Sequence, residues 1–474
     1  MQNNTSPSLG TSVLKSTVFS LIQLTIIAAG LFYFRDNINL KVAGIIAAIV
    51  VVVIPAIIAI IDRLRGTPKW INFLGYALGW WRIDWFIWAR KWRAARLWEM
   101  LGYEEDGKVR LTRTRDGDIL RAKVPGLDRE RLITDLKKYL DRRKYATITP
   151  IDHEGRTDFA EVFLWRTDPL RRAFEITTPD EVDVNTEAGT IQGLARDDFG
   201  QDVNLDFSGV SGMLVAGMSG SGKTLSLISG LFPYFFEGAS TGETKLFIAD
   251  GKGGGDWSAL APLALNRKPG EVDITELAHI TGWLCKERSR RVAFCEKVGV
   301  ANGWNLPRKQ MPHFTLIIDE CQLFLSQGNF FTKEEKHAYQ QVIRGITELV
   351  KMGRSAAITV ILITQKTDGE AIPTQIRDIA QLRVSFRQPN RVGSELIFGT
   401  IPEDAISPHE LPARMPGLAV VLNDRSEYTR CRFNYITDNT ARNWREMAMR
   451  TRAEIAQKTT QNQNFGGRKV GVTR

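Results

Sequence analysis

The sequence predicts an α/β fold. Between residues 212 and 364, short apolar runs with strand character alternate with longer runs of helical character. The first apolar run, Met213 to Ala216, passes directly into a glycine-rich loop and then into the start of a helix. Short apolar strands joined through helices usually pair in parallel and are buried on both faces. We therefore expect a parallel sheet with helices on each side.

Each expected element of this larger part corresponds to a recognisable run of residues. Short apolar runs predict buried strands, and longer runs with apolar residues three or four positions apart predict helices. The expected strands lie at 213–216, 245–250, 314–319 and 358–364, and the expected helices lie at about 273–297 and 333–352, with another beginning near 225.

Residues 101–184 predict a smaller α/β domain that precedes the sheet. Runs at 108–114 and 118–124 are typical of a hairpin, because the Asp116-Gly117 pair between them favours a tight turn. The other expected elements are a helix at 128–144, with apolar residues at Leu132, Leu136 and Leu140, and strands at 146–151 and 159–165. No catalytic pattern occurs in this domain, so we interpret it as a spacer or assembly module.

The composition is that of a globular protein with excess positive charge. The chain has 474 residues, of which 43% are hydrophobic and 24% are charged, and its formal net charge is +10. This length allows two to four domains. The charge suits either nucleic acid or an anionic membrane surface and does not choose between them. The four cysteines contain no C-x-x-C pair and the five histidines are scattered, so neither a disulfide framework nor a zinc site is expected.

Two apolar runs follow a polar tail at 1–15 that we expect to be disordered. They lie at 16–34 and 42–61, and each approaches the ~20 residues that cross a bilayer as a helix. A cleavable signal peptide is the alternative for the first run, but no convincing cleavage site separates it from the second. We expect a transmembrane hairpin at 16–61. Basic residues concentrate after it, which places both termini in the cytoplasm.

Seven of the twelve tryptophans fall within residues 62–100, interspersed with Arg and Lys. Trp81, Trp85, Trp88 and Trp92 step by four, three and four residues, which places them on one face of a helix. We interpret this segment as a juxtamembrane amphipathic helix with its tryptophans at the level of the lipid headgroups. A platform that binds nucleic acid through aromatic and basic side chains is the alternative.

The glycine-rich loop matches G-x-x-x-x-G-K-[ST], the phosphate-binding loop. Its glycines let backbone N–H groups point at phosphate oxygens, and the following helix directs its positive end at the same anion. Lys223 would reach the β- and γ-phosphates, and the Thr224 hydroxyl would hold Mg²⁺. A chance match is the alternative, but the strand before and the helix after the loop favour a nucleotide site for ATP. The candidate binding residues are Gly217, Met218, Ser219, Gly220, Ser221, Gly222, Lys223 and Thr224.

A second motif places two adjacent carboxylates after four apolar residues of the strand at 314–319. Ligands bind at the carboxyl ends of the strands in such sheets. Asp319 would hold Mg²⁺ together with Thr224, and Glu320 would orient or deprotonate the attacking water. Alone, the motif could be a strand that ends in a polar turn. Its position about a hundred residues after the phosphate loop favours nucleotide hydrolysis.

Two further strand ends carry candidate residues. Gln365 follows the strand at 358–364 and would contact the γ-phosphate or the attacking water; a capped strand end is the alternative. Asp250 and Lys252 follow the strand at 245–250 and would line the same site.

The order of these motifs resembles that of FtsK/SpoIIIE-type DNA translocases. The resemblance covers roughly 185–435, and its more specific elements are Asp-Gly-Lys-Gly-Gly at 250–254 and Gly-Arg-Ser-Ala-Ala at 353–357. Other matching elements occur at 193–200, 383–387 and 417–421. The two apolar runs, the short intermediate domain and the total size look closest to the conjugative FtsK-like proteins of actinobacterial mobile elements, the TraB/TraSA type.

The resemblance implies a RecA-like P-loop NTPase motor at 185–440 that uses ATP and Mg²⁺. It also implies a ring, usually a homo-hexamer, that pumps double-stranded DNA through its centre, so Asp250 and Lys252 would line either the site or the pore. A neighbouring subunit would supply an arginine to the γ-phosphate. Arg354 is the first candidate because it opens the strand at 358–364, and Arg387 is the second; an ordinary cation at a helix C-terminus is the alternative for Arg354.

The resemblance thus implies a multi-pass protein of the bacterial cell membrane, with its motor in the cytoplasm, that moves DNA in plasmid or integrative-element transfer. A related ring ATPase for protein secretion is one alternative, although such chains usually have several phosphate loops and only one occurs here. A membrane coupling or scaffold protein with a nucleotide switch is another, and the intact Asp319-Glu320 pair weighs against it. Residues 441–474, a basic helix to about 457 and a polar tail from 459, are too short for the winged-helix domain of chromosome-segregating members.

Overall fold

The structure, a computed structural model, describes residues 108–123, 127–143, 145–151, 159–266, 272–366, 372–402, 405–423 and 425–466. The predicted transmembrane hairpin at 16–61 and the tryptophan-rich segment at 62–100 lie outside these residues. Among the helices that are described, none has the length and apolar character that a membrane span requires.

The chain divides into two compact units that meet between Thr167 and Asp168. Residues 168–184 therefore pack with the larger unit, whereas the sequence predicted a boundary between 184 and 185. One reason is a buried ion pair, because Arg430 contacts both Asp168 and Asp198 within the larger unit.

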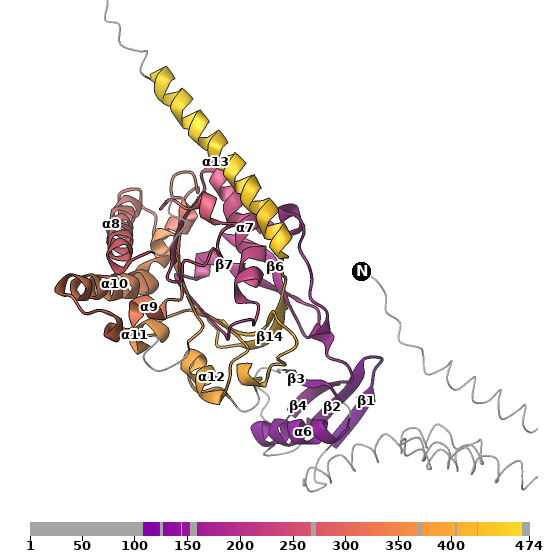
Figure 1. The fold of residues 1–474 in the computed structure, drawn as a ribbon. Coiled ribbons are helices and arrows are strands. Elements are labelled where there is room, and N and C mark those ends of the chain that lie inside the picture. Colours follow the sequence, from indigo (N-terminus) through magenta and orange to yellow (C-terminus); the bar gives the residue numbers. More distant parts are fainter. Residues whose placement is uncertain are drawn as a thin grey trace, which may run out of the picture. The chain divides into compact units, whose positions relative to one another are not determined.

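The smaller unit is a four-stranded antiparallel sheet with one helix, and its strands lie in the order β1-β2-β4-β3 (Figure 1). The elements are β1 (Lys108–Arg113), β2 (Gly117–Lys123), α6 (Arg129–Arg143), β3 (Thr147–Ile151) and β4 (Phe159–Trp165). Leu132, Ile133 and Leu136 of α6 are fully buried in the core of this unit. The predicted hairpin, helix and later strands are confirmed.

The larger unit contains a ten-stranded sheet in the order β5-β6-β14-β13-β12-β8-β11-β10-β9, with β7 paired to β6. Its strands are β5 (Val184–Asn185), β6 (Thr190–Asp197), β7 (Asp202–Asp206), β8 (Gly212–Ala216), β9 (Thr244–Asp250), β10 (His313–Asp319), β11 (Ile358–Thr364), β12 (Leu382–Phe386), β13 (Leu418–Leu422) and β14 (Tyr428–Phe433). The five strands from β9 to β12 run parallel, which confirms the predicted parallel sheet.

The remaining strands extend this sheet in antiparallel fashion from β12 through β13, β14 and β6. The sequence did not predict this extension. Antiparallel neighbours need no crossover helix, and β13 and β14 are joined by only residues 423–427, so the alternation of strands and helices that indicates a parallel sheet is absent between them.

The helices of the larger unit cover both faces of the sheet. They are α7 (Lys223–Thr241), α8 (Ile274–Lys297), α9 (Gln322–Leu325), α10 (Lys333–Met352), α11 (Thr374–Arg377), α12 (Arg391–Phe398) and α13 (Asp438–Gly466). Alternate residues of β8 belong to different cores: Met213 and Val215 pack in the core of α7 and α13, and Leu214 and Ala216 in that of α8 and α10. Figure 1 shows these two pairs of helices on either side of the strands.

Helix α13 differs from the sequence prediction in its length and in its packing. It continues to Gly466, so the polar tail predicted from 459 is wrong as far as that residue. Its first turns are part of the core of the larger unit, because Trp444 and Ala448 are buried there. The Trp444 ring stacks on Phe232 of α7 with centroids 4.7 Å apart. The helix is therefore an element of the larger unit, not an appendage to it.

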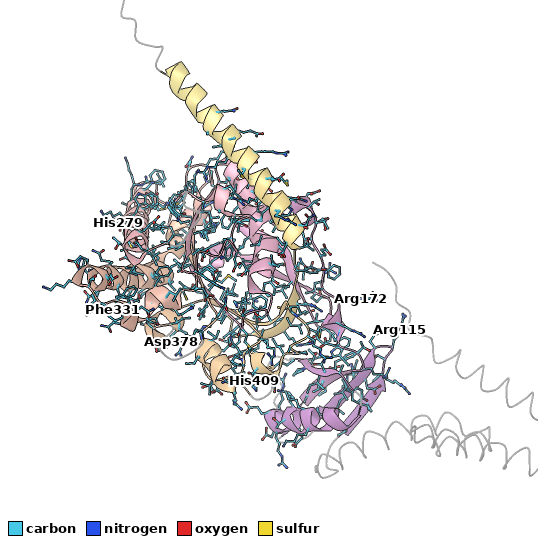
Figure 2. The ribbon with its side chains drawn as sticks, viewed as in Figure 1. Arg115, Arg172, His279, Phe331, Asp378 and His409 are labelled. Carbon is cyan, nitrogen blue, oxygen red and sulfur yellow. The ribbon has the colours of Figure 1, made fainter. Side chains whose placement is uncertain are left out.

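The histidines of the larger unit come from several different elements. Figure 2 shows His279 on α8 and His409 near α12, in separate parts of the unit, and His313 is fully buried at the start of β10. The four cysteines are all unpaired thiols. Within the described residues, no group of three or more His, Cys, Asp or Glu side chains is arranged to hold a metal ion.

Candidate nucleotide site

The phosphate loop connects the end of β8 to the start of α7, and two of its glycines are required by its geometry. Gly222 is the N-cap of α7 and has a φ of 93°, in the left-handed region. A Cβ at Gly222 would stand 2.8 Å from the backbone nitrogen of Gly417, and a Cβ at Gly217 would stand 2.7 Å from Cβ of Phe386. Only glycine fits these two positions without movement of the neighbouring segments.

The Lys223 side chain turns back into the loop. Its ammonium donates to the carbonyl oxygens of Gly217 at 2.5 Å and Met218 at 3.0 Å, and the residue is only 6% exposed. Burial lowers the pKa of Lys223 to about 8, although the charges of Glu320 and Asp319 oppose this shift. The ammonium is thus held by neutral carbonyls, and a nucleotide phosphate would offer it an anionic partner.

Asp319 ends β10, and both of its carboxylate oxygens are engaged. The Trp257 indole N–H donates to Oδ2 at 2.8 Å, and the Glu320 N–H donates to Oδ1 at 2.9 Å. Burial raises the pKa of Asp319 to about 6 despite these two hydrogen bonds. The carboxylate is therefore mostly ionised at neutral pH. Together with the Thr224 hydroxyl in the first turn of α7, it offers the oxygen ligands that Mg²⁺ prefers.

Glu320 occupies an unusual backbone conformation next to Asp319. Its φ is 48°, a region that costs a non-glycine residue on the order of 1–3 kcal/mol and that is concentrated at functional sites. Its Oε2 accepts hydrogen bonds from the Gln322 side-chain amide at 2.8 Å and from the Gln365 backbone N–H at 3.3 Å. The side chain is thus oriented by α9 on one side and by the end of β11 on the other.

Gln365 therefore lies at the site, as predicted, and its described contact there is made by the backbone. The structure also brings in Gln322, which the sequence reasoning missed. The Gln322 side chain spans Glu320 and Thr364, whose hydroxyl lies 2.7 Å from its Oε1. A polar residue two positions after the acidic pair was the only sequence signal for this contact.

Asp250 lies beside Asp319, because the two residues are partners in the parallel pairing of β9 and β10. Its Oδ1 accepts the backbone N–H groups of Lys252 at 2.9 Å and Gly253 at 3.0 Å, so it shapes the turn after β9. Lys252 is exposed. The structure thus places Asp250 next to the acidic pair and leaves the Lys252 side chain in solvent.

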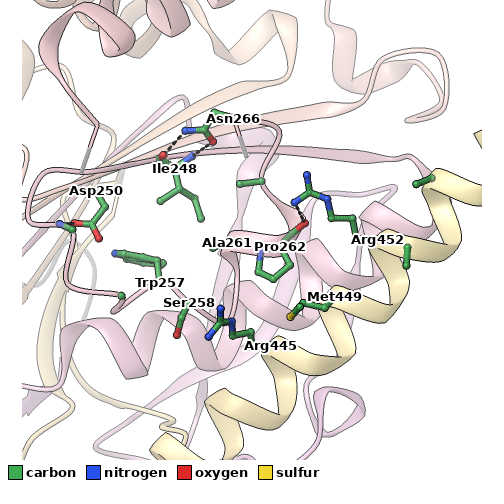
Figure 3. A pocket seen from close by; sticks show the side chains of 15 residues that line it. Ile248, Asp250, Trp257, Ser258, Ala261, Pro262, Asn266, Arg445, Met449 and Arg452 are labelled. Atoms are coloured by element: carbon green, nitrogen blue, oxygen red, sulfur yellow. Dashed lines mark hydrogen bonds between the residues drawn. The ribbon is translucent and has the colours of Figure 1, made fainter. Parts of the chain in front are cut away.

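Asp250 also lines a cavity of about 550 Å³. The cavity lies between the loop after β9 and α13, where Arg445, Met449 and Arg452 form one wall (Figure 3). Trp257, which also lines it, is the residue that donates to Asp319, so one indole ring separates the cavity from the acidic pair. The sequence reasoning did not single out Trp257.

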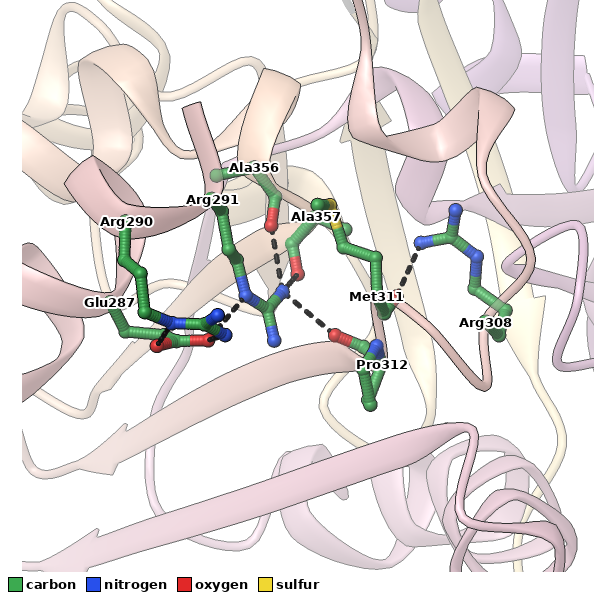
Figure 4. A network of polar contacts seen from close by, with 8 residues as sticks. All are labelled: Glu287, Arg290, Arg291, Arg308, Met311, Pro312, Ala356 and Ala357. Carbon is green, nitrogen blue, oxygen red and sulfur yellow. Dashed lines mark hydrogen bonds and ion pairs between the residues drawn. The ribbon is translucent and has the colours of Figure 1, made fainter. Parts of the chain in front are cut away.

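Arg354 lies at the opposite edge of the sheet from the phosphate loop. It begins a short 3₁₀ turn, Arg354–Ala356, just before the amino end of β11, and its side chain is exposed. Its Nε donates to the Ser208 carbonyl at 3.2 Å. Buried Arg291 holds this turn, because its Nη1 donates to the carbonyls of Pro312 and Ala356 at 2.8 Å each (Figure 4). Arg354 therefore does not reach the site of its own chain.

Arg387, the second candidate for an arginine supplied by a neighbour, contacts the phosphate loop of its own chain. It follows β12 directly, and its carbonyl accepts the Met218 N–H at 3.0 Å. Its Nη1 lies 3.3 Å from the Met218 sulfur. Arg387 thus differs from Arg354, because its side chain contacts the phosphate loop of its own subunit.

Comparison with known proteins supports the assignment of the motor. Residues 175–393 match the model of the FtsK/SpoIIIE family. The matched region contains the phosphate loop, the acidic pair and Gln365, so it includes the motifs that suggested the resemblance.

Two curated relatives differ in how much of their length they share with this chain. DNA translocase FtsK of Staphylococcus aureus is 26% identical over 228 residues, which cover 44% of this chain and 26% of that protein. Transfer protein TraSA of Streptomyces ambofaciens is 25% identical over 348 residues, which cover 69% of this chain and 79% of that protein. The chain thus matches about a quarter of the length of the FtsK relative and most of TraSA.

Among solved structures, the pCW3 conjugation coupling protein TcpA, in its monomer form with ATPγS, has the same fold. The similarity has a TM-score of 0.52 at 14% identity and covers 76% of this chain and 98% of TcpA. The α/β P-loop motor fold predicted from the sequence is therefore confirmed.

Proposed function

We propose that this protein is an ATP-driven translocase of double-stranded DNA that serves the conjugative transfer of a plasmid or integrative element. The observation that carries the proposal is the geometry of the site. The phosphate loop follows β8 and the buried Asp319-Glu320 pair follows β10, at the same edge of one parallel sheet in an FtsK/SpoIIIE domain. The names of TraSA and TcpA, a transfer protein and a conjugation coupling protein, support the biological role.

In this proposal the loop binds the phosphates of ATP, and Lys223 exchanges its carbonyl partners for the β- and γ-phosphates. Thr224 and Asp319 would hold Mg²⁺, which neutralises charge that develops on the phosphates. Glu320 orients the attacking water and accepts its proton, while Gln322 and the Gln365 N–H keep the carboxylate in position.

The proposed assembly is a homo-hexameric ring anchored in the bacterial cell membrane by the hairpin at 16–61, with the motor in the cytoplasm. Arg354 supports this arrangement because it is exposed and lies at the edge of the sheet away from its own loop. In a ring, that edge would face the nucleotide of a neighbour, where a guanidinium stabilises the charge of the transferring phosphoryl group.

The test is the ATPase rate of the purified full chain with and without DNA. We expect linear double-stranded DNA to raise the rate several-fold, and Lys223→Ala to abolish both the basal and the stimulated rate. An ATPase that ignores double-stranded DNA, or that responds only to single strands, would contradict the proposed substrate.

A further inference from the structure

Arg387 lies on the side of the phosphate loop away from the acidic pair. In the sheet, β8 has β11 and then β10 on one side, and β12 on the other. The phosphate loop follows β8, Glu320 follows β10 and Arg387 follows β12. Hydrolysis requires the γ-phosphate to face Glu320. The nucleoside end of the same molecule therefore extends toward β12 and Arg387.

The guanidinium is held over the loop by contacts within its own chain. Its Nε donates to the Leu411 carbonyl at 3.1 Å, and Nη1 contacts the Met218 sulfur. The segment that follows Leu411 also packs on the loop, since the Gly417 N–H donates to the Ser221 carbonyl at 2.9 Å. The position of Arg387 is thus set before any ligand arrives, which limits the entropy that binding would cost.

The positive charge of Arg387 has no partner among the described residues. No carboxylate there forms an ion pair with it, and its Nη2 has no acceptor, although the residue is half-buried. Arg383, on the same strand, is different: its guanidinium donates to several carbonyls, including those of Ile397 and Phe398. A half-buried arginine that keeps a free donor beside an anion-binding loop is well suited to bind a phosphate.

Ser221 provides a second observation at the same place. Its side chain is 9% exposed, and its Oγ has no hydrogen-bond partner among the described residues. The Oγ lies inside the loop, because a Cβ at Gly217 would stand 2.9 Å from it. Buried polar groups without a partner are costly, so this hydroxyl also indicates a polar ligand in the loop.

We propose that Arg387 binds the nucleotide held by its own subunit, through the phosphate nearest the nucleoside, and not the γ-phosphate of a neighbour's nucleotide. The inference rests on the proposed function only in that the loop binds ATP and ADP. Because the contacted phosphate is present in both nucleotides, Arg387 sets the affinity for both alike and does not sense hydrolysis.

The experiment measures the dissociation constants of ADP and ATPγS for the full chain, with Mg²⁺ and without DNA. Arg387→Gln removes the charge and keeps a donor for the Leu411 carbonyl. We expect both constants to rise by the same factor, roughly 10- to 100-fold, which is the usual effect of a lost charge-assisted hydrogen bond. Arg387→Met keeps the aliphatic part of the side chain over Met218 and should raise both dissociation constants in the same way. This variant tests the proposal if Arg387→Gln fails to fold.

The matched control is Arg391→Ala, which also removes one positive charge near the end of β12. The Arg391 guanidinium is paired with Glu395 of α12 at 2.6 Å, so both nucleotide affinities should stay unchanged. Wild-type affinities in the Arg387 variants would overturn the inference. A loss for ATPγS alone would also overturn it, because that result assigns the residue to the γ-phosphate. A wild-type chain that binds neither nucleotide would instead contradict the proposed function.

Discussion

The Thr364 hydroxyl is shared between two acceptors close to the proposed general base. It lies 2.7 Å from Oε1 of Gln322 and 2.8 Å from the Lys366 carbonyl, but it has one proton to donate. When the proton points at Gln322, the amide is oriented with its NH₂ toward Glu320. When it points at Lys366, that orientation loses its support. Gln322 is thus a positioning residue whose state depends on the end of β11.

Replacement of Gln322 should therefore affect the chemical step more than substrate binding. For Gln322→Leu we expect kcat to fall on the order of tenfold, a part of the ~10²–10⁴ that general-base catalysis contributes, with KM for ATP nearly unchanged. The steady-state ATPase rate measures this. Leu323→Ala, at the next and partly exposed position of α9, is the control. An unchanged kcat, or a rise in KM alone, would show that the amide contact has no role in catalysis.

Two substitutions in the predicted motifs should separate binding from hydrolysis. Lys223→Ala removes the ammonium inside the loop, so we expect both nucleotide binding and turnover to be lost. Glu320→Gln keeps the size of the side chain but cannot accept a proton, so ATP binding should remain while hydrolysis falls by at least ~10²-fold. Equilibrium binding of ATP and release of phosphate measure the two effects. Normal turnover in either variant would refute the assignment of these residues.

At this scale, the sequence predicted the residues that lie within contiguous motifs and missed those that reach the site from elsewhere. Lys223, Asp319 and Glu320 follow strand ends, and parallel pairing brings such ends to one edge. Trp257 reaches Asp319 across 62 positions of the chain. Arg387 was named only as a candidate for a neighbour's site, and its contact with Met218 of its own loop spans 169 positions. Such contacts depend on how loops fold over the sheet, which no local pattern encodes.

Strand β10 begins with a histidine in the interior. His313 is fully buried, and its ring nitrogens lie 2.9 Å from the Tyr234 hydroxyl and 3.0 Å from the Thr359 hydroxyl. Burial lowers the pKa of His313 well below its ordinary value of 6.5, and the charges of Arg308 and Arg291 lower it further. The folded chain therefore keeps this ring neutral.

This histidine should make the larger unit sensitive to mild acid. Below pH 6.5 the unfolded chain binds a proton at His313 that the folded chain does not, so stability is retained above this value and lost as the pH falls. One such proton contributes up to ~1.4 kcal/mol per pH unit. We expect His313→Gln to reduce the slope of unfolding free energy against pH between 6.5 and 5.5.

Chemical denaturation at several pH values measures this slope. His279→Ala removes an exposed histidine and should leave the slope as it is. The comparison concerns slopes, so it holds even if the His313 variant is less stable throughout. A slope that is equal in wild type and His313→Gln would mean that other groups account for any acid sensitivity.

The elements that the sequence predicted best are those whose burial is uniform. Strands β10 and β11 are buried at all seven positions, and α10 has an apolar stripe with polar residues opposite, so their limits were foreseen within one residue. The antiparallel extension was missed because its strands mix buried and partly buried residues, as in β14. The sequence prediction ended α13 too early, because the later turns of this helix are polar and show no periodic apolar pattern.

At the scale of the whole molecule, a chain with a net charge of +10 should hold DNA through its phosphates. Binding of this kind releases counterions, and its logarithm falls with the logarithm of salt concentration at a slope of about −0.9 per phosphate contact. We expect the DNA concentration for half-maximal ATPase stimulation to rise steeply between low and moderate salt. The DNA-independent rate serves as the control and should change little; a salt-independent half-point would contradict phosphate-based binding.

The proposed ring makes each catalytic site a product of two subunits. Lys223→Ala and Arg354→Ala chains should each be inactive alone, because one lacks the loop lysine and the other the arginine for its neighbour. In an equimolar mixture, some interfaces combine an intact loop with an intact Arg354, so part of the ATPase rate should return. A mixture of Lys223→Ala with Arg387→Gln should gain no such sites. Failure of the first pair to complement, in assembled mixtures, would place Arg354 outside the neighbour's site.

Strand β11 joins the two ends of this arrangement. Gln365 and Thr364 stand at its carboxyl end beside Glu320, and the Arg354 turn, fixed by Arg291, stands at its amino end. Its seven buried residues span about 23 Å at roughly 3.3 Å each, and it is paired with a parallel strand on each side. In the proposed ring, β11 connects the nucleotide site of its own subunit to the arginine that contacts the nucleotide of a neighbour. A tilt of β11 caused by the nucleotide of one subunit would move Arg354 relative to the nucleotide of the neighbouring subunit. The order of hydrolysis around the ring would then need no other connecting element.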